Sequence, residues 1–111
     1  MATIAECRDA LQRLAERLAA NAEAQGKLNL DRSLSVELVD LGTGFHARLT
    51  GGQIVDITDG TDPGAKIKLS ATSDDLIALI NGELNFAKAW TSGRVSVKAN
   101  VLDLMKLRSL L

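Results

Sequence analysis

The spacing of apolar residues near the N-terminus predicts an amphipathic helix. Apolar side chains recur three or four positions apart, at Ile4, Cys7, Leu11, Leu14 and Leu18. This spacing places them on one face of a helix. Thr3 and Glu6 form a capping-box pattern at its start, and the helix is expected to run to about Glu23 and to stop before Gly26. The repeat is too short for a coiled coil, so we expect the helix to pack on its own sheet.

From Leu34 the period of the pattern changes to two, which predicts strands. One strand alternates through Leu34, Val36 and Leu38, and the next through Phe45, Ala47 and Leu49. Glycines at 42 and 44 mark the first turn, glycines at 51 and 52 mark a hairpin into a third strand over 53–58, and residues 59–64 form a loop. A fourth strand covers 66–71, with Ile67 and Leu69 on one face. Clean alternation indicates a sheet with helices on one face and water on the other.

The last third of the chain predicts two short helices separated by glycine. Ser73 is the expected cap of the first helix, whose apolar residues are Leu76, Ile77, Leu79 and Ile80. Gly82 is a natural stop in the left-handed conformation. Asn85 is the expected cap of a second, very short helix that Gly93 ends, and it carries Phe86, Ala89 and Trp90.

A fifth strand and a last helix complete the pattern. Residues 94–98 alternate, with Val95 and Val97 on one face, and Asn100 with Asp103 can cap a helix over 101–111. This helix is apolar on almost every side, so we expect weak self-association, and a possible homodimer, through it. The predicted fold is one α+β domain over 1–111, with a five-stranded, mostly antiparallel sheet and its helices on one face.

Composition narrows the class of protein. The chain has 111 residues, which suits a single core, and its net charge of -1 gives no argument for nucleic acid. No apolar run is long enough to span a membrane, and Glu6 and Asp9 lie where a signal peptide would be basic and then apolar. With one cysteine, the expected compartment is the reducing cytoplasm. With only three aromatic residues, aliphatic side chains must do most of the filling.

The residues that could carry chemistry do not form a catalytic set. His46 is expected on the polar side of its strand, and Cys7 lies on the apolar helix stripe as a small hydrophobe. Asp56, Asp59 and Asp62 lack the spacing of a calcium loop, and Asp-Gly and Asp-Pro-Gly are ordinary turn sequences. We therefore expect no enzyme, no metal and no cofactor.

The order and spacing of about forty residues resemble a known family. The residues that carry the resemblance are Gly82-Glu-Leu-Asn85, Ala89-Trp90, Gly93 with the Arg-Val-Ser-Val-Lys strand, Asn100, and Leu104-Met-Lys-Leu107. This arrangement resembles the sterol carrier protein (non-specific lipid-transfer, sterol-binding) family, as a stand-alone bacterial-type member. Two departures stand out: Phe86 replaces a common proline, and Ala99 replaces the usual glycine before Asn100.

The resemblance implies that sheet and helices enclose a hydrophobic tunnel for intracellular lipid transfer or presentation. The implied ligands are a fatty acid, a fatty acyl thioester, a phospholipid or a sterol. The expected lining is Phe45, Leu76, Ile80, Leu84, Phe86, Ala89, Trp90, Val97, Leu104 and Met105. Periodicity does not separate a tunnel from a filled core, so the alternative is a non-catalytic accessory domain that docks a partner enzyme or dimerises.

On the predicted strands, several basic residues occupy positions that alternate with the inward apolar ones and so face away from the helices. They are Arg48, Lys66, Lys68, Arg94 and Lys98. Such a strip could meet a carboxylate, a phosphate head group or an acidic membrane surface, which makes transient membrane contact possible. We favour the simpler interpretation, a solvated sheet face on which charges discourage aggregation.

Overall fold

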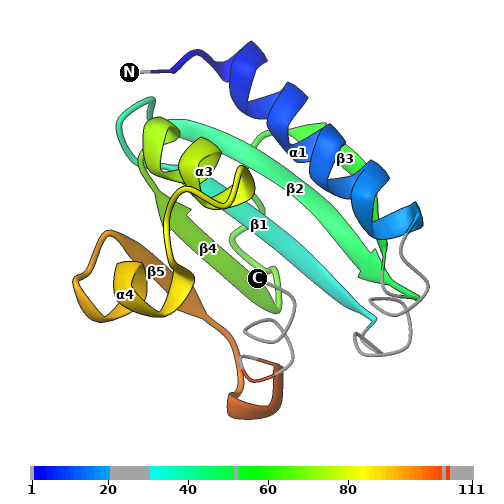
Figure 1. Cartoon of the computed structure of the whole chain (residues 1–111). Coiled ribbons are helices and arrows are strands. Elements are labelled where there is room, and N and C mark those ends of the chain that lie inside the picture. Colours follow the sequence, from blue (N-terminus) through cyan, green and yellow to red (C-terminus); the bar gives the residue numbers. More distant parts are fainter. Residues whose placement is uncertain (1, 21–30, 52, 104, 106–111) are drawn as a thin grey trace.

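A computed structural model describes residues 2–20, 31–51, 53–103 and 105 of the chain (Figure 1). Its helices are α1 (Ile4–Ala20), α3 (Ser73–Ile80) and α4 (Phe86–Thr91). Its strands are β1 (Arg32–Leu38), β2 (Thr43–Thr50), β3 (Gln53–Asp59), β4 (Ile67–Ala71) and β5 (Val95–Lys98). The order of elements predicted from the sequence is confirmed for these residues. The expected extension of the first helix to about residue 23 lies outside them.

The five strands form one sheet in the order β3-β2-β1-β4-β5. The β1–β4 pair is parallel and the other three pairs are antiparallel, which confirms the mostly antiparallel prediction. In the register of the central strands, Val36 lies opposite Phe45 on one side and Leu69 on the other. Residues directly opposite each other point to the same face, so the predicted apolar parity is continuous across the middle of the sheet.

The described helices cover one face of this sheet. In Figure 1, α1 runs across β2 and β3, and α3 lies beside it over the central strands. The buried apolar residues of the strands include those at the predicted inward positions, among them Val36, Leu38, Phe45, Leu49 and Ile67. Helix α4 packs chiefly against β5. The core is therefore built from one face of the sheet and the apolar sides of three short helices.

Strand β3 departs from simple alternation at Asp56. The pairing with β2 shifts register here, and Asp56 has a φ of 57°, in the left-handed region. Such a β-bulge adds one residue to the strand. As a result Ile54 and Ile57, three positions apart, both pack on the core. A strict period of two would have turned one of them outward.

The outer face of the sheet is partly covered, which corrects the expectation of a fully wet face. The chain must pass from β3 to β4 across β2 and β1, and residues 60–66 make this crossing. His46 Nδ1 lies 2.7 Å from the Gly60 carbonyl oxygen, and the Ser35 hydroxyl accepts a hydrogen bond from the Asp62 amide at 3.0 Å. Since a carbonyl oxygen only accepts, Nδ1 carries the hydrogen. His46 is thus a half-buried anchor for the loop, and not the plain surface residue that its parity predicted.

The predicted helix starts are confirmed with one correction. Thr3 and Glu6 form the capping box, and Asn85 caps α4 by accepting from the Lys88 amide at 3.0 Å. The predicted cap of α3 is wrong by one residue. Thr72, which accepts from the Asp75 amide, is the cap, and Ser73 is the first helical residue. Both hydroxyl residues suit a cap, so the sequence does not distinguish them.

The displaced Ser73 has a different structural role. Its side chain is fully buried, donates to Asp40 Oδ2 at 2.6 Å and accepts from the Ala2 amide at 3.0 Å. It thereby ties the N-terminus, the turn after β1 and the start of α3 together. The hydrogen bond from Ser73 lowers the pKa of the Asp40 carboxyl.

The start of the last predicted helix is also present. The Asn100 side chain accepts from the Asp103 amide at 2.8 Å, which is the expected cap. Asp103 is buried, and Arg32 of β1 reaches its carboxylate at 3.2 Å. Residues 104 and 106–111 lie outside the described residues, so self-association through this helix stays a prediction.

Candidate functional site

A cavity of about 80 Å³ lies between the sheet and the three helices. Every described side chain that lines it is apolar, and the lining comes from α1, α3, α4 and all five strands. The residues are Leu11, Leu14, Leu34, Val36, Leu49, Ile54, Ile67, Leu69, Leu76, Leu79, Ile80, Phe86 and Val97.

The cavity separates two packed groups of side chains. The larger group contains side chains of α1, Leu76 and Ile80 of α3 and much of the inward face of the strands. The smaller group gathers Phe86 and Ala89 of α4 with Val95 of β5, Ala71 of β4 and Leu79 of α3. Leu69 and Val97 are half-buried and lie at the boundary between them. The core is therefore not one continuous packed body, and α4 with β5 forms a separate wall of the cavity.

Some of the lining predicted from the sequence is found at the cavity. Leu76, Ile80, Phe86 and Val97 line it. Phe45 is buried in the larger group, with the Arg8 guanidinium 5.9 Å from its ring, but it does not reach the cavity. Leu84 and Ala89 belong to the smaller group around α4, behind the cavity wall.

Trp90 and Met105, two residues of the expected lining, lie outside the lining of the cavity. Trp90 is 39% exposed, and its ring packs at the surface with its centroid 6.1 Å from that of Phe86. Helix α4 has only six residues and turns Phe86 and Ala89 inward, so Trp90 falls at the edge of the buried face. Met105 is 65% exposed, and Leu104 lies outside the described residues.

Sequence reasoning missed the contribution of α1. Leu11 and Leu14 line the cavity, although the expected lining contained no residue of the first helix. Both leucines belong to the helical stripe that predicted packing on the sheet. Periodicity identifies the buried face of α1, but it does not tell which part of that face meets a void.

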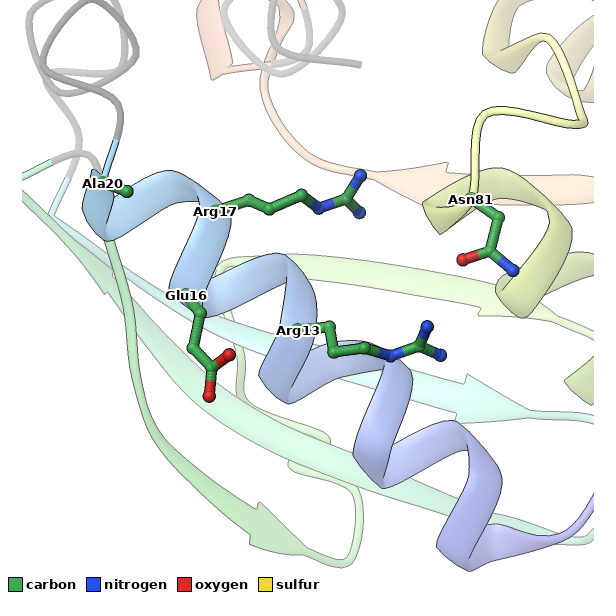
Figure 2. A pocket seen from close by; sticks show the side chains of 5 residues that line it. All are labelled: Arg13, Glu16, Arg17, Ala20 and Asn81. Carbon is green, nitrogen blue, oxygen red and sulfur yellow. The ribbon is translucent and has the colours of Figure 1, made fainter.

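A polar groove lies between α1 and the end of α3 (Figure 2). Its volume is about 430 Å³, and its lining is Arg13, Glu16, Arg17, Ala20 and Asn81. The Arg17 guanidinium donates from Nη2 to the Ile80 carbonyl oxygen at 2.7 Å, which joins the two helices. Arg13 pairs with Asp9 of its own helix at 3.2 Å.

The predicted strip of basic residues on the outer face of the sheet contains fewer free cations than the alternation along the strands indicated. Arg94 turns toward the helix layer, where its guanidinium binds Asp75 of α3 at 2.5 Å. Arg48 pairs with Asp31 at 2.7 Å. Lys68 and Lys98 lie directly opposite each other in the β4–β5 register, and they remain on the outer face with Lys66 next to them in a shallow hollow.

The candidate chemical groups have structural partners. Burial raises the pKa of the Cys7 thiol, and its sulfur lies 3.8 Å from the Ser73 carbonyl oxygen, so the unreactive thiol form is favoured. Asp59 binds Arg8, and Asp62 accepts from the Gly64 amide within its turn. Among the described residues, no group of three or more histidine, cysteine, aspartate or glutamate side chains could hold a metal ion. In the same part of the chain, no helix is long and apolar enough to cross a membrane.

Comparison with known proteins points to one family. A sequence model of the SCP-2 sterol transfer family matches residues 6–111, whereas no curated protein matches the sequence. The sterol carrier protein domain 2 of Helicoverpa armigera has a similar solved structure, with a TM-score of 0.67 and 21% identity over 90% of this chain and 80% of that chain. The palmitated SCP2L2 of Aedes aegypti has a TM-score of 0.66 and 14% identity, over 91% and 89% of the two chains.

A longer protein contains the same fold. The inverting sec-alkylsulfatase Pisa1 from Pseudomonas sp. matches with a TM-score of 0.67 and 23% identity over 88% of this chain. This chain spans only 15% of the length of the sulfatase. At such identities these structures show a shared fold.

Proposed function

Because the chain belongs to the SCP-2 sterol transfer family, we propose that it binds one long-chain hydrophobic ligand between its sheet and its helices. The candidate ligands are a fatty acid, a fatty acyl thioester, a phospholipid and a sterol. The ligand would be carried through the cytoplasm or presented to an enzyme. No catalytic residue is needed for either task.

The observation that carries this proposal is the wholly apolar lining of the cavity. Burial of an alkyl chain against such a surface is worth about 0.8 kcal/mol for each methylene group. A chain of about ten methylenes would thus gain about 8 kcal/mol before the entropic penalties of binding. Apolar burial therefore supplies the main driving force for binding a long chain, and polar contacts would add selectivity.

The size of the cavity implies that its walls move when such a ligand enters. Ligand pockets usually measure about 300–1,000 Å³, and this cavity has about 80 Å³. Two of its walls, α3 and α4, are short helices, and each is followed by a glycine in the left-handed conformation, Gly82 with φ 77° and Gly93 with φ 81°. Helix α4 packs chiefly on β5, so we expect the cavity to enlarge mainly by movement of α4 with β5 away from α1 and α3.

The proposal is tested by ligand binding to a variant with a blocked cavity. Leu69→Trp places a large ring at the half-buried edge of the cavity and should abolish saturable binding of a fluorescent fatty acid. Val39→Trp is the matched control, because Val39 is 55% exposed and does not line the cavity. Direct excitation of the fluorescent fatty acid provides the signal, so that the added tryptophans do not contribute to it. Absence of saturable binding by the wild type to all four ligand classes would refute the proposal.

A second candidate is an accessory domain that docks a partner protein. Exposed apolar side chains favour it, namely Trp90, Val101, Leu102 and Met105. A like fold also forms part of the longer sulfatase chain. This candidate predicts no co-purifying lipid in denaturing mass spectrometry. It also predicts self-association or partner binding in sedimentation experiments, which Val101→Ser with Leu102→Ser would remove.

A further inference from the structure

We propose that the outer side of the sheet carries a second binding site, for a soluble anion with two or more linked phosphate groups. The site is formed by Lys66, Lys68 and Lys98 with Asn100, where the starts of β1 and β4 meet the end of β5. The lysines lie on the face of the sheet opposite to the cavity, so the site is separate from the proposed lipid site.

Two shallow hollows adjoin at this end of the sheet. One has a volume of about 400 Å³ and the other of about 460 Å³, and Arg32, Lys66 and Asn100 line both of them. The charged side chains of the described lining are Arg32, Arg48, Lys66, Lys68, Lys98, Asp31 and Asp103. Five cations against two carboxylates leave an excess of three positive charges here, in a chain whose net charge is -1.

The two carboxylates already bind the two arginines. Arg48 Nη2 lies 2.7 Å from Asp31 Oδ1, and Arg32 Nε lies 3.2 Å from Oδ2 of the buried Asp103. Within the described part of the chain, none of the three lysines has a carboxylate partner. The excess of positive charge therefore resides on the lysines.

The lysines are placed so that they repel one another. Lys68 and Lys98 lie directly opposite each other in the antiparallel β4–β5 pair. Facing residues of such a pair have Cβ atoms about 5 Å apart, and like charges in this position destabilise a sheet. Lys66 lies two positions before Lys68, which is about 7 Å along an extended chain. Local violations of the rules of stability are typical of functional sites, so this repulsion indicates an anionic ligand that neutralises it.

Protection against aggregation explains only part of this arrangement. Lysines on an exposed edge strand hinder pairing with another chain. Strand β5 is an edge strand, so Lys98 has this explanation. Lys68, however, belongs to β4, which pairs with β1 on one side and with β5 on the other. A lysine on an inner strand has no edge to protect.

The spacing of the lysines suits a compact anion of high charge. Each lysine carries a compact ammonium group on a flexible stem, so the three groups can meet at one ligand. A diphosphate or triphosphate offers several charges within that span, whereas the carboxylates of a protein partner carry one charge each. Asn100 can add neutral donors. Its Oδ1 accepts from the Asp103 amide at 2.8 Å, and its amide nitrogen has no partner among the described residues.

The loop before β4 favours a small soluble ligand over a membrane. This loop crosses the outer face, where His46 and Ser35 bind its main chain. It ends at Lys66, whose amide donates to the Ser33 hydroxyl at 3.0 Å. The lysines thus lie in hollows beside a raised segment. A flat bilayer would meet the loop first, whereas a small anion can enter the hollows.

The test is a calorimetric titration of the 111-residue chain with phosphate, pyrophosphate and tripolyphosphate, at constant ionic strength and without divalent metal ions. We expect one tripolyphosphate to bind per chain, about tenfold more tightly than phosphate, because the longer anion contacts more ammonium groups. Binding that does not saturate, or equal affinity for the three anions, would overturn the proposal. Tighter binding of a hexaglutamate peptide or of phosphatidylglycerol vesicles than of tripolyphosphate would also overturn it, in favour of an acidic protein or a membrane.

Variants assign the binding to the lysines. Lys68→Gln and Lys98→Gln should each weaken tripolyphosphate binding by about tenfold. Lys88→Gln is the matched control and should bind as the wild type does, because Lys88 is an exposed residue of α4 that lines neither hollow. Wild-type affinity in both site variants would refute the assignment.

Stability without the ligand provides a second readout. At low ionic strength the two site variants should unfold at a urea concentration at least as high as the wild type does, because each removes a repulsive charge. A purely structural role of the lysines would instead lower the urea midpoint and leave anion affinity unchanged. Neither readout involves the lipid cavity, so failure of this proposal and failure of the proposed function are distinguishable.

Discussion

The cavity allows a prediction of the stability of a Leu76 variant. Leu76 belongs to α3, is 1% exposed and lines the cavity. Leu76→Ala removes three carbon atoms and joins their space to the existing void. Substitutions of this kind cost about 2.7–5.0 kcal/mol, and the penalty rises with the volume left empty, by about 24 cal/mol for each Å³. The space around Leu76 is already partly open, so little collapse can follow, and we expect a loss of about 3–4 kcal/mol.

Leu38→Ala is the matched comparison. Leu38 is fully buried in the same group of side chains but does not reach the cavity. The Leu38→Ala protein should therefore lose a similar amount of stability, about 3 kcal/mol, without a change in the cavity. The two variants differ in whether the new space is continuous with the proposed binding site.

The assay combines urea unfolding with ligand titration on both variants. An enlarged cavity needs less movement of its walls to accept a chain, so Leu76→Ala should bind a fatty acid at least as tightly as the wild type. It should also recover more stability on saturation than Leu38→Ala does, because a ligand stabilises the state that it binds. Equal effects of the ligand on the two variants would refute the assignment of this cavity as the binding site.

Four other predictions concern individual contacts. Ser73→Ala should cost about 1–3 kcal/mol in urea unfolding, because it removes the donor to Asp40 and leaves the amide of the buried Ala2 without its acceptor. Since the pKa of Asp40 is lowered in the folded state, the stability that it contributes is present above about pH 4 and is lost as the pH falls through the folded pKa; Asp40→Asn should flatten that acid limb of the unfolding profile. Arg32→Ala should cost about 1–3 kcal/mol by leaving the buried Asp103 carboxylate without its guanidinium, and restored stability in Arg32→Lys would show that charge is what matters. Trp90→Ala should cost only about 1–2 kcal/mol, because the ring is partly exposed and covers Phe86 at the surface; a loss above about 3 kcal/mol would mean that the ring is buried.

The order of strands and helices was predictable because local signals agree along the chain. The change of period at Leu34, the glycines after Leu38 and before Gln53, and the Asn85 and Asn100 caps each act over a few residues. Such features depend on sterics and hydrogen bonds between near neighbours. They can be recognised without knowing what packs on them.

Features that depend on a distant partner were not predictable in the same way. The bulge at Asp56 is defined by its pairing with β2, and the buried position of Ser73 depends on Asp40 and on the N-terminus. Arg94 has the parity of an outward residue, but it lies just before β5 and turns back to Asp75. In each case the local pattern allowed two conformations, and a contact far along the chain selected one.

The cavity shows why the pattern of apolar positions along the sequence does not by itself predict ligand binding. Every described residue that lines it is apolar, as it would be in a filled core. The difference is one of volume. The two groups of side chains do not close completely against each other. Of the three aromatic rings only Phe86 reaches the gap, since Trp90 lies at the surface and Phe45 is buried in the larger group without lining the cavity. A closely packed interior resists the entry of a ligand, whereas two groups that meet along an apolar void can be separated at lower energetic cost. Lipid binding would thus depend on how the two groups meet, and periodicity within each segment does not determine that.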